Sequence, residues 1–512
     1  MRRCSRDCPA HSRRDILKTA ATGGAGFVLF SSKTGTVSAA GNDSNDLDGE
    51  IHHDVVVDWD SENNDRISFE ATFEFSGIDE ISLWAPEEVT VEDTGGFDKS
   101  RGDYWTDTSG ATIVASVPTQ PDQIIQTIYG GDDWALIAPE RVMFVTSHQL
   151  GNVDYTLDIS IADSTEGVAH GHHALLGSYE AHSKESSREK ITVVVPDAAD
   201  LVSPDEEIVD ALVRTSDRLA ISGESEEIYK FAVPQEMPFG GSSDGSNSSA
   251  WTRSDFPIDR VQSVWDHEYV HTRQEYQGIQ KRILTDETRW IFEGQADHYG
   301  ILLPFEDGRV SFSEMQSAYR RGKRERHEDV VLKERESWIE ERRANYELGA
   351  LVLGRLDLEI RRTTDGDQSI DAVLGQLNEL PADTELTHDQ LLSLIEETST
   401  AEVADMADEF ISTTQRPDVW GEEIHQQYFE SRTQEESTDE ESEPESDESQ
   451  VSESDDTADE EANDSETTPD TESTADTDDD IPGFGVTSPI LALSTLAYLL
   501  KQRMFGDTQE SE

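Results

Sequence analysis

The sequence predicts an α+β, multidomain fold in which an N-terminal antiparallel β-sandwich precedes a mainly helical domain. Residues 52–195 contain short segments rich in β-branched and aromatic residues, separated by Gly, Asp and Asn, as expected of antiparallel strands. After Pro204 the apolar residues recur at helical spacing instead. The chain has 512 residues, which is enough for two or three domains and at least one large core.

The β-sandwich is assigned to residues 50–197, where no helical spacing occurs. The strand-like segments read VVVDWD, ISFEATFEF, ISLWAP, ATIVASV, WALIAP, RVMFVTS, YTLDISIAD and KITVVVP. Short strands with turn residues between them are typical of a sandwich of two sheets.

The helical domain is assigned to residues 200–430. It opens with a predicted helix from Pro204, PDEEIVDALVRTSDRL, and a predicted strand, IYKFAVP at 228–234, followed by a flexible Gly- and Ser-rich loop at 240–249. Longer helices are predicted at 259–277, 286–302, 313–345 and 346–362, and shorter ones at SIDAVLGQL, DQLLSLIEE and EVADMADEFIS.

The charge balance is strongly acidic, with 40 Lys and Arg against 110 Asp and Glu and a formal net charge of -70. Such a surface repels phosphates, so we expect no nucleic-acid partner. Carboxylates spread through the folded part, and not only in a tail, suit a very salty medium in which charge repulsion is screened. The composition therefore indicates a halophilic archaeon as the source.

The N-terminal residues 1–40 resemble a Tat-type signal peptide. A twin arginine in SRRDILK precedes the apolar run AATGGAGFVLF and the small-residue site VSAA, and the apolar part is too short to cross a membrane. The two cysteines, Cys4 and Cys8, lie within this segment, so a mature chain would contain neither disulfides nor thiolate metal ligands. Any metal would be held by His, Asp or Glu.

The C-terminal end is predicted to attach the protein to a membrane. Residues 431–480 form an acidic stalk in which about half of the later residues are Asp or Glu, a composition that favours disorder. Residues 481–503 begin with PGF, continue as an apolar run and end in basic residues, and a short tail follows at 504–512. This order resembles an archaeal PGF-type sorting signal cleaved by an archaeosortase; an ordinary transmembrane helix is the alternative.

The stretch WDHEYVH at 265–271 carries the clearest chemical pattern. His267 and His271 are four residues apart, so on a helix both imidazoles can reach one point. Glu268, about 100 degrees round the helix axis, lies beside that point and can take a proton from a metal-activated water. This is the zinc-peptidase pattern HExxH, although five residues alone can arise by chance.

A third ligand is predicted in RWIFEGQADHYG. Glu293 lies on a separate amphipathic helix and offers a carboxylate to a zinc site that leaves one position open for water. Asp297, one helical turn later, can accept the N–H of a zinc-binding histidine and so fix its tautomer. His298 and the cluster at 170–173 are other conceivable metal ligands, and surface loop histidines are the simpler interpretation of them.

HEYVH followed by WIFEGQADHYG resembles the gluzincins, the thermolysin-like peptidases with two histidines and a glutamate on zinc. The run YELGALVLGRLDLEIRRTTDGDQSIDAVL, from Tyr346, resembles a block of the glycyl aminopeptidase-like family. The resemblance covers about residues 52–425 and implies a thermolysin-like catalytic domain after a β-domain. It also implies that Tyr346 stabilises the oxyanion, a role that suits a phenol donor.

The sequence departs from that family in two places. Family members often carry a Gly-Gly-x-Glu-His segment whose glutamate binds a substrate amino group; this chain reads FGGSSDGSNSS, leaving Gly240 and Gly241 with Asp244 at best in that role. The PDZ domain common in the family is absent from the sequence, because the acidic stalk begins where it would start. Aminopeptidase and endopeptidase action therefore both stay open.

These observations predict a secreted, surface-anchored zinc metallopeptidase with one Zn²⁺ per chain, held by His267, His271 and Glu293, with Glu268 and Tyr346 as catalytic residues. Its substrate would be a peptide or unfolded protein lying along an edge strand containing IYKFAVP. Its partners during export would be the Tat translocase and an archaeosortase. The alternatives are a catalytically inactive gluzincin-fold binding module and hydrolysis of a non-peptide bond.

Overall fold

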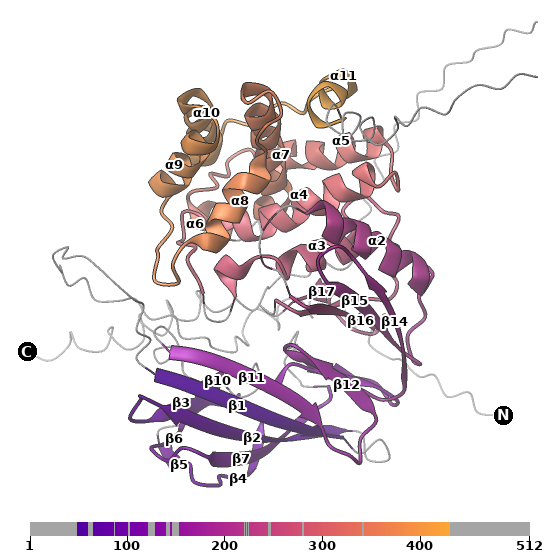
Figure 1. Ribbon diagram of the computed structural model, residues 1–512, viewed down its shortest axis with the longest axis vertical. Helices are drawn as coiled ribbons and strands as arrows, with labels where there is room; N and C mark the ends of the chain where they lie inside the picture. Colours follow the sequence, from indigo (N-terminus) through magenta and orange to yellow (C-terminus); the bar gives the residue numbers. More distant parts are fainter. Residues whose placement is uncertain are drawn as a thin grey trace, which may run out of the picture.

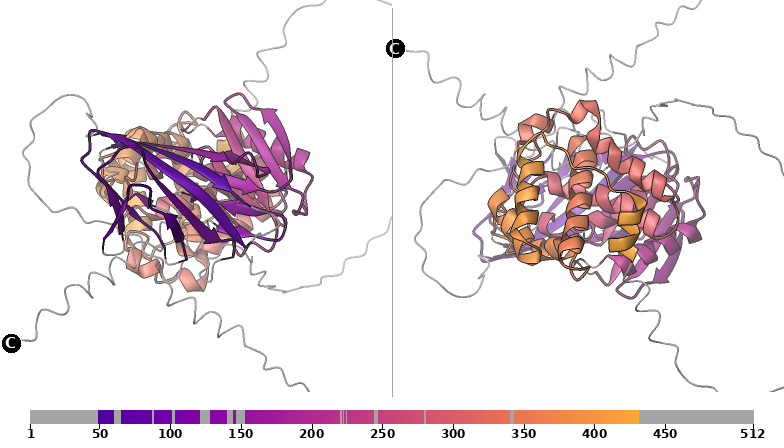
Figure 2. Two further views of the ribbon diagram at one scale, coloured as in Figure 1. Left: turned by 90° about the horizontal axis from the view of Figure 1, so that it is seen from below. Right: turned by 90° about the horizontal axis from the view of Figure 1, so that it is seen from above.

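The computed structural model describes residues 49–430 apart from 60–64, 87, 101–102, 121–127, 140–143, 146–152, 220, 222, 224, 244–246, 279–280 and 340–342. These residues form three layers: N-terminal sheets, a central sheet, and helices above it (Figure 1). Views from below and above show the sheets and the helices on opposite faces of the molecule (Figure 2). The predicted α+β class, sheets first and helices after, is confirmed.

The first N-terminal sheet has five strands in the order β11-β1-β2-β7-β4. Inward-facing apolar residues alternate with outward polar ones, as along β2, where Ile67, Phe69 and Phe73 are buried. β1 and β11 pair in parallel, so the unit is not antiparallel throughout. The strands are β1 (Gly49–Asp58), β2 (Arg66–Ser76), β4 (Thr90–Asp93), β7 (Ala111–Pro118) and β11 (Val153–Ile161).

Two four-stranded sheets, β10-β3-β6-β5 and β12-β13-β9-β8, complete the N-terminal unit. Their inward residues share one core with the first sheet, which includes Leu83, Tyr104 and Leu176. The strands are β3 (Ile81–Trp84), β5 (Asp98–Ser100), β6 (Asp103–Thr106), β8 (Ile128–Gly130), β9 (Ala135–Ile137), β10 (Phe144–Val145), β12 (Gly167–His170) and β13 (His173–Leu176).

The central sheet has the order β14-β15-β16-β18-β17 and lies between the N-terminal sheets and the helices (Figure 1). Its strands are β14 (Tyr179–Glu185), β15 (Lys190–Pro196), β16 (Glu227–Val233), β17 (Gly241–Ser242) and β18 (Ser249–Arg253). The predicted domain boundary between 197 and 200 falls inside this sheet, because β15 pairs with β16 across it. β14 and β15 therefore belong structurally with the helical unit.

Two predictions about this sheet are wrong. IYKFAVP forms β16, which pairs with β15 on one side and β18 on the other, so it is an interior strand and not an edge. The Gly- and Ser-rich segment at 240–249, predicted to be a loop throughout, contains β17, which pairs with β18 and is an edge. Strand order depends on pairing between segments far apart in sequence, which local patterns do not contain.

The central sheet is apolar on both faces, as expected of a covered sheet. Val193, Ile228 and Ala232 face the helices and join the main helical core. Phe231 and Trp251 face the other way and pack with residues of β9 and β13. The sheet therefore joins the two units through a continuous apolar layer.

The helices are α2 (Asp205–Arg218), α3 (Val264–His271), α4 (Trp290–Glu306), α5 (Phe312–Arg320), α6 (Arg335–Trp338), α7 (Ala344–Thr363), α8 (Ile370–Glu379), α9 (His388–Thr398), α10 (Ala401–Ser412) and α11 (Glu422–His425). Shorter turns are η2 (Glu275–Gln277), η3 (Arg321–Lys323), η4 (Glu325–His327) and the π-turn η5 (Gln426–Glu430). The helix predicted over 313–345 is wrong: α5 ends at Arg320, where Gly322 packs against the backbone of α7, and short turns follow.

The predicted signal at 1–40, stalk at 431–480, sorting segment at 481–503 and tail at 504–512 lie outside the described residues, as does Asp244. Among the residues that are described, no helix has the length and apolar character needed to cross a membrane.

Candidate active site

Helix α3 carries the HExxH pattern and is buried on all sides, because it lies between the central sheet and α4. Ser263 caps its N-terminus by accepting a hydrogen bond from the backbone N–H of Asp266. The backbone N–H of Ser263 donates to the carbonyl of Gly300 at 3.0 Å, which ties the start of α3 to α4.

Glycines let α4 and α7 cross closely. A Cβ built on Gly294 would lie 3.0 Å from the Cα of Gly349, and one on Gly349 would lie 2.9 Å from the Cα of Gly294. Since Glu293 precedes Gly294 and Tyr346 lies one turn before Gly349, this crossing brings the predicted third ligand and the predicted oxyanion donor together. Larger residues at either glycine would force the helices apart.

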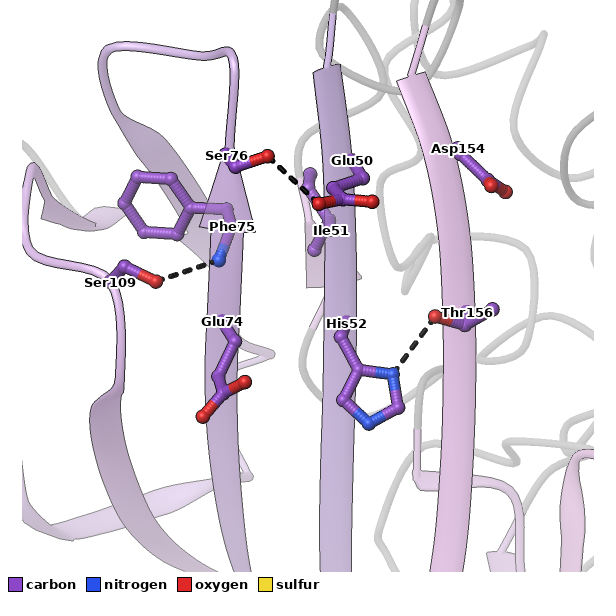
Figure 3. Close-up of a pocket in the computed structure, with 9 residues that line it drawn as sticks. All are labelled: Glu50, Ile51, His52, Glu74, Phe75, Ser76, Ser109, Asp154 and Thr156. Carbon is purple, nitrogen blue, oxygen red and sulfur yellow. Dashed lines mark hydrogen bonds between the residues drawn. The ribbon is translucent and has the colours of Figure 1, made fainter.

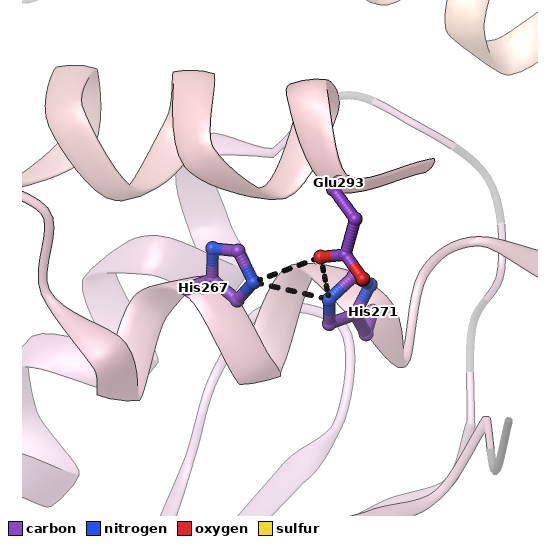
Figure 4. A group of neighbouring side chains, drawn as sticks. All are labelled: His267, His271 and Glu293. Carbon is purple, nitrogen blue, oxygen red and sulfur yellow. Dashed lines mark hydrogen bonds and ion pairs between the residues drawn. The ribbon is translucent and has the colours of Figure 1, made fainter. Parts of the chain in front are cut away.

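The three predicted ligands converge (Figure 4). Oε2 of Glu293 lies 3.4 Å from Nε2 of His267 and 3.3 Å from Nε2 of His271. The two Nε2 atoms are 3.1 Å apart. Tetrahedral ligands about 2.0–2.1 Å from a zinc ion stand about 3.3–3.4 Å from one another, so these separations match such a site.

The surroundings of these atoms also fit a cation. Oε2 of Glu293 is buried and has no hydrogen-bond partner among the described residues, although both imidazoles are close. A buried carboxylate oxygen in that position is costly unless a cation or donor satisfies it. Two imidazole nitrogens and one carboxylate oxygen are a donor set suited to zinc that leaves a fourth position open.

The protonation states favour metal binding. Burial would raise the pKa of Glu293, but the two imidazoles beside it lower it to about 2, so it is anionic. Burial lowers the pKa of His267 to about 4 against the opposing effect of Glu293, so that imidazole is neutral. The pKa of His271 is raised, because the effects of Glu293 exceed that of burial, and a metal would displace that proton.

Glu268 lies against the edge strand β17. It is 6% exposed, and a Cβ built on Gly241 would come within 2.8 Å of its Oε1. The predicted Gly240 and Gly241 segment is therefore beside the predicted base, although Asp244 is outside the described residues. Only a residue without a side chain leaves space for the glutamate here.

Tyr346 lies beside His267. Its ring stacks on that of His267, with centroids 5.8 Å apart and planes inclined by 10°. Burial and the negative charges of Glu293 and Glu268 raise its pKa well above the usual value, so the phenol keeps its proton. Phe292 stacks in the same way on His271, at 4.3 Å.

Asp297 lies on the Nδ1 side of His267, as predicted, but makes no hydrogen bond with it. Its Oδ1 lies 3.9 Å from Nδ1 of His267, beyond hydrogen-bond length. Its Oδ2 accepts a hydrogen bond of 2.9 Å from Nε2 of Gln262. Burial raises the pKa of Asp297 to about 7 despite that bond.

Gln274 is a supporting residue that the sequence patterns did not reveal. Its Oε1 lies 2.6 Å from Nδ1 of His271, and its Nε2 donates to the carbonyl of Phe292 at 2.8 Å. One side chain therefore fixes the tautomer of His271 and links it to the residue preceding Glu293. A glutamine just after a helix has no distinctive sequence signal.

Lys230 is a second unpredicted residue near the site. It lies on β16, is fully buried, and its Nζ has no hydrogen-bond partner among the described residues. Burial lowers its pKa to about 7, and the charges of Glu268 and Asp266 oppose that change. The sequence contains a signal for this residue, because a lysine in an otherwise apolar strand indicates a buried charge.

The interpretation of His298 and the 170–173 cluster as surface loop residues is wrong for His298 and His173, which are buried in α4 and β13. His173 is buried and contacts Oγ of Ser249 at 2.8 Å, while His170 stacks on Tyr229 at 4.1 Å. These contacts join the β12-β13 hairpin to the central sheet. His298 is buried in α4 and contacts the hydroxyl of Tyr319 at 2.9 Å. The geometry brings none of them to the ligand site.

A second group of potential metal ligands lies on the outer face of the first sheet. Nε2 of His52 is 3.1 Å from Asp54 and 3.4 Å from Asp158, whose side chains are 47% and 73% exposed. His52 also lines a pocket of about 400 Å³ together with Glu74 and Asp154. Figure 3 shows these side chains on neighbouring strands. Exposed carboxylates are solvated by water, so this group needs no cation.

Comparisons with known proteins place the fold. No protein-family model and no curated protein match the sequence. An aminopeptidase N family protein from Idiomarina loihiensis superposes with a TM-score of 0.54 at 13% identity, covering 73% of this chain and 78% of that one. An M1 zinc metallopeptidase from Deinococcus radiodurans gives 0.51 at 12%, covering 72% and 95%.

A two-domain M1 zinc metallopeptidase variant bound to L-tryptophan gives a TM-score of 0.52 at 13% identity, covering 72% of this chain and 96% of that one. The narrower resemblance to glycyl aminopeptidases stays a prediction. At these identities the likeness concerns the path of the chain, and it shows that this protein has the multidomain α+β fold of the M1 metallopeptidases.

Proposed function

We propose that this protein is a zinc metallopeptidase of the gluzincin type with one zinc ion per chain. One observation carries the proposal: two imidazole nitrogens and a carboxylate oxygen stand 3.1–3.4 Å apart in a buried site. That spacing suits a tetrahedral ion, and HExxH places a glutamate beside it. Solved proteins of the same fold are described as zinc metallopeptidases, one of them bound to a Tyr-Ser-Ala substrate, which supports the choice of ion and of peptide.

When bound, zinc would lower the pKa of a coordinated water and polarise the scissile carbonyl. The protein's own residues supply the rest. Glu268 accepts the proton of the attacking water and later transfers it to the leaving amine. Tyr346, protonated in this site, donates a hydrogen bond to the carbonyl oxygen as negative charge develops there. His267, His271 and Glu293 hold the ion in place.

The substrate would bind along β17 by strand addition. β17 is the edge of the central sheet beside Glu268, whereas β16, the strand first expected to bind peptide, is covered on both sides. An extended peptide can add to the outer side of an edge strand through main-chain hydrogen bonds, independent of its side chains. This mode suits unfolded protein as well as short peptides.

The direct test is cleavage of a mixed peptide library in molar salt, with the bound zinc counted by mass spectrometry. We expect hydrolysis that a chelator abolishes and added zinc restores. Products trimmed from the N-terminus would identify an aminopeptidase, and internal cuts an endopeptidase. Absence of hydrolysis by zinc-loaded, folded protein would contradict the proposal.

A catalytically inactive binding module is the second candidate. The loop FGGSSDGSNSS favours it, because the glutamate that binds a substrate amino group in the resembled family is missing there. This candidate predicts that the library peptides bind along β17 without being cut. The same assay, followed by recovery of intact bound peptides, separates the two functions.

We further propose export by the Tat translocase and attachment to the outer face of the membrane. The support is sequence pattern: the twin arginine within 1–40 and the PGF segment within 481–503. Mass spectrometry of the mature protein tests this. A start near residue 41 with a lipid near residue 482 is expected, and an intact chain with both ends would contradict it.

A further inference from the structure

Gln262 has a backbone conformation that is unusual for its residue type. Its φ is 57°, and among the described residues Asp365 is the other non-glycine with positive φ, at 51°. Asp365 lies in an exposed turn after α7, where aspartate is well tolerated. Gln262 is 4% exposed. Glutamine is neither glycine nor one of Asn, Asp and His, the residues that adopt positive φ most readily. Strain at a buried position persists when the surroundings impose it, and it marks functional sites.

The strained residue directs its side chain at Asp297. Nε2 of Gln262 donates to Oδ2 of Asp297 at 2.9 Å, entirely within the protein. The other oxygen of Asp297 lies 3.9 Å from Nδ1 of His267. The three side chains therefore form a row that leads from the start of α3 to a predicted metal ligand.

The backbone around Gln262 is tightly held. Ser263, the next residue, caps α3 and donates its N–H to the carbonyl of Gly300. A Cβ on Gly300 would lie 3.3 Å from the carbonyl oxygen of Ser263 and 3.6 Å from Cβ of His267. The close approach of α4 to the first turn of α3 thus leaves Gln262 in the left-handed region, with its amide toward α4.

We propose that Gln262 is a positioning residue of the metal centre: its strained backbone holds an amide on Asp297 and so aims that carboxylate at His267. The carboxylate so held lies 3.9 Å from Nδ1 of His267. An acceptor on that side of the ring favours the tautomer with the proton on Nδ1, which leaves Nε2 as the metal-binding nitrogen. Gln274 performs the equivalent task for His271 by direct contact. Each ligand histidine is therefore supported by a glutamine: Gln262 acts on His267 through Asp297, and Gln274 contacts His271 directly.

The inference rests on the proposed zinc site but not on peptidase activity, so its test measures metal affinity. The variants are Gln262→Met, which keeps the shape and removes the donor, Asp297→Asn, and the double variant. The matched control is Gln277→Met, a change at a buried glutamine on η2 that makes none of the contacts that support His267 and His271. Zinc affinity is measured by chelator competition in molar salt, and folding by the thermal midpoint of the metal-free protein.

We expect Gln262→Met to weaken zinc binding about 10- to 100-fold, and Gln277→Met to leave it unchanged. Because Gln262 acts through Asp297, its substitution should have little further effect in the Asp297→Asn background. Affinity of Gln262→Met within twofold of wild type, or full additivity in the double variant, would overturn the inference. If Gln262→Met does not fold, Gln262→Asn, which tolerates positive φ but is too short to reach Asp297, replaces it and should lose affinity likewise. Weak zinc binding by the wild type would instead refute the proposed function.

Discussion

Gly241 of the edge strand lies against Glu268 of the buried helix: a Cβ on Gly241 would stand 2.5 Å from Cγ and 2.8 Å from Oε1 of the glutamate. The edge strand proposed to bind peptide and the proposed general base therefore lie against each other. The backbone of a substrate strand added to β17 would lie next to Glu268, the residue proposed to transfer protons during hydrolysis.

Gly241→Ala should displace the Glu268 side chain and leave the fold intact, because the three atoms nearest to the new Cβ all belong to this one side chain and none to the backbone. We expect kcat to fall about 100-fold with zinc content unchanged, since small misplacements of reacting groups are that costly. The control is Gly375→Ala, where a Cβ meets nothing within 4 Å. Steady-state kinetics with zinc analysis checks this, and normal turnover by Gly241→Ala would contradict the placement of Glu268.

Glu268→Gln should retain zinc and lose turnover by several orders of magnitude, because an amide cannot accept the proton of the attacking water. Glu275→Gln, on η2 beyond the helix, provides a control that should stay active. Single-turnover assays alongside metal analysis measure both quantities. Near-normal activity in Glu268→Gln would remove this residue from its proposed role.

Tyr346→Phe should reduce kcat about 100- to 1,000-fold and change KM less, because the phenol donor acts mainly on charge that develops in the transition state. Zinc content should be preserved, since the ring that stacks on His267 remains. Parallel falls in zinc content and kcat would instead indicate that Tyr346 only supports the ligand.

Gln274→Leu should weaken zinc binding about 10- to 100-fold, because His271 loses the partner of its Nδ1 atom. Gln277→Leu is the matched control: its amide has no hydrogen-bond partner among the described residues, so replacing it leaves nothing unpaired. Chelator competition measures the affinities. Equal affinities for the two variants would show that Gln274 has no special role.

Lys230→Met should stabilise the protein, and more so at lower pH. Burial in the folded protein lowers the pKa of Lys230 from 10.5 to about 7. Above pH 10.5 the buried lysine therefore costs no unfolding free energy through its charge. The cost increases as the pH falls to 7 and is constant below that. The advantage of Lys230→Met should therefore grow by about 2–4 kcal/mol across that window. Denaturant unfolding at constant high salt measures it, and a pH-independent difference would mean that the lysine is not buried as described.

Sequence patterns predicted the parts of this protein that depend on local geometry. Histidines four residues apart share a helix face whatever surrounds the helix, so the spacing of His267 and His271 was enough to pair them. Glu293 followed from its own helix and from the chemistry of a third ligand. The order of sheets and helices followed from the change of apolar period after Pro204.

Tertiary structure decided what depends on contacts between distant segments. It placed IYKFAVP inside the sheet and put β17 at the edge, because pairing partners come from elsewhere in the chain. It placed Gln274 against His271 and Gln262 against Asp297, although nothing in the neighbouring sequence distinguishes either glutamine, and it buried Lys230 near Glu268. The sequence by itself determined which atoms can bind a metal, because two of the predicted ligands are one helical turn apart. Only the tertiary structure determined which residues hold those ligands in place, because the supporting contacts join segments that are far apart in the sequence.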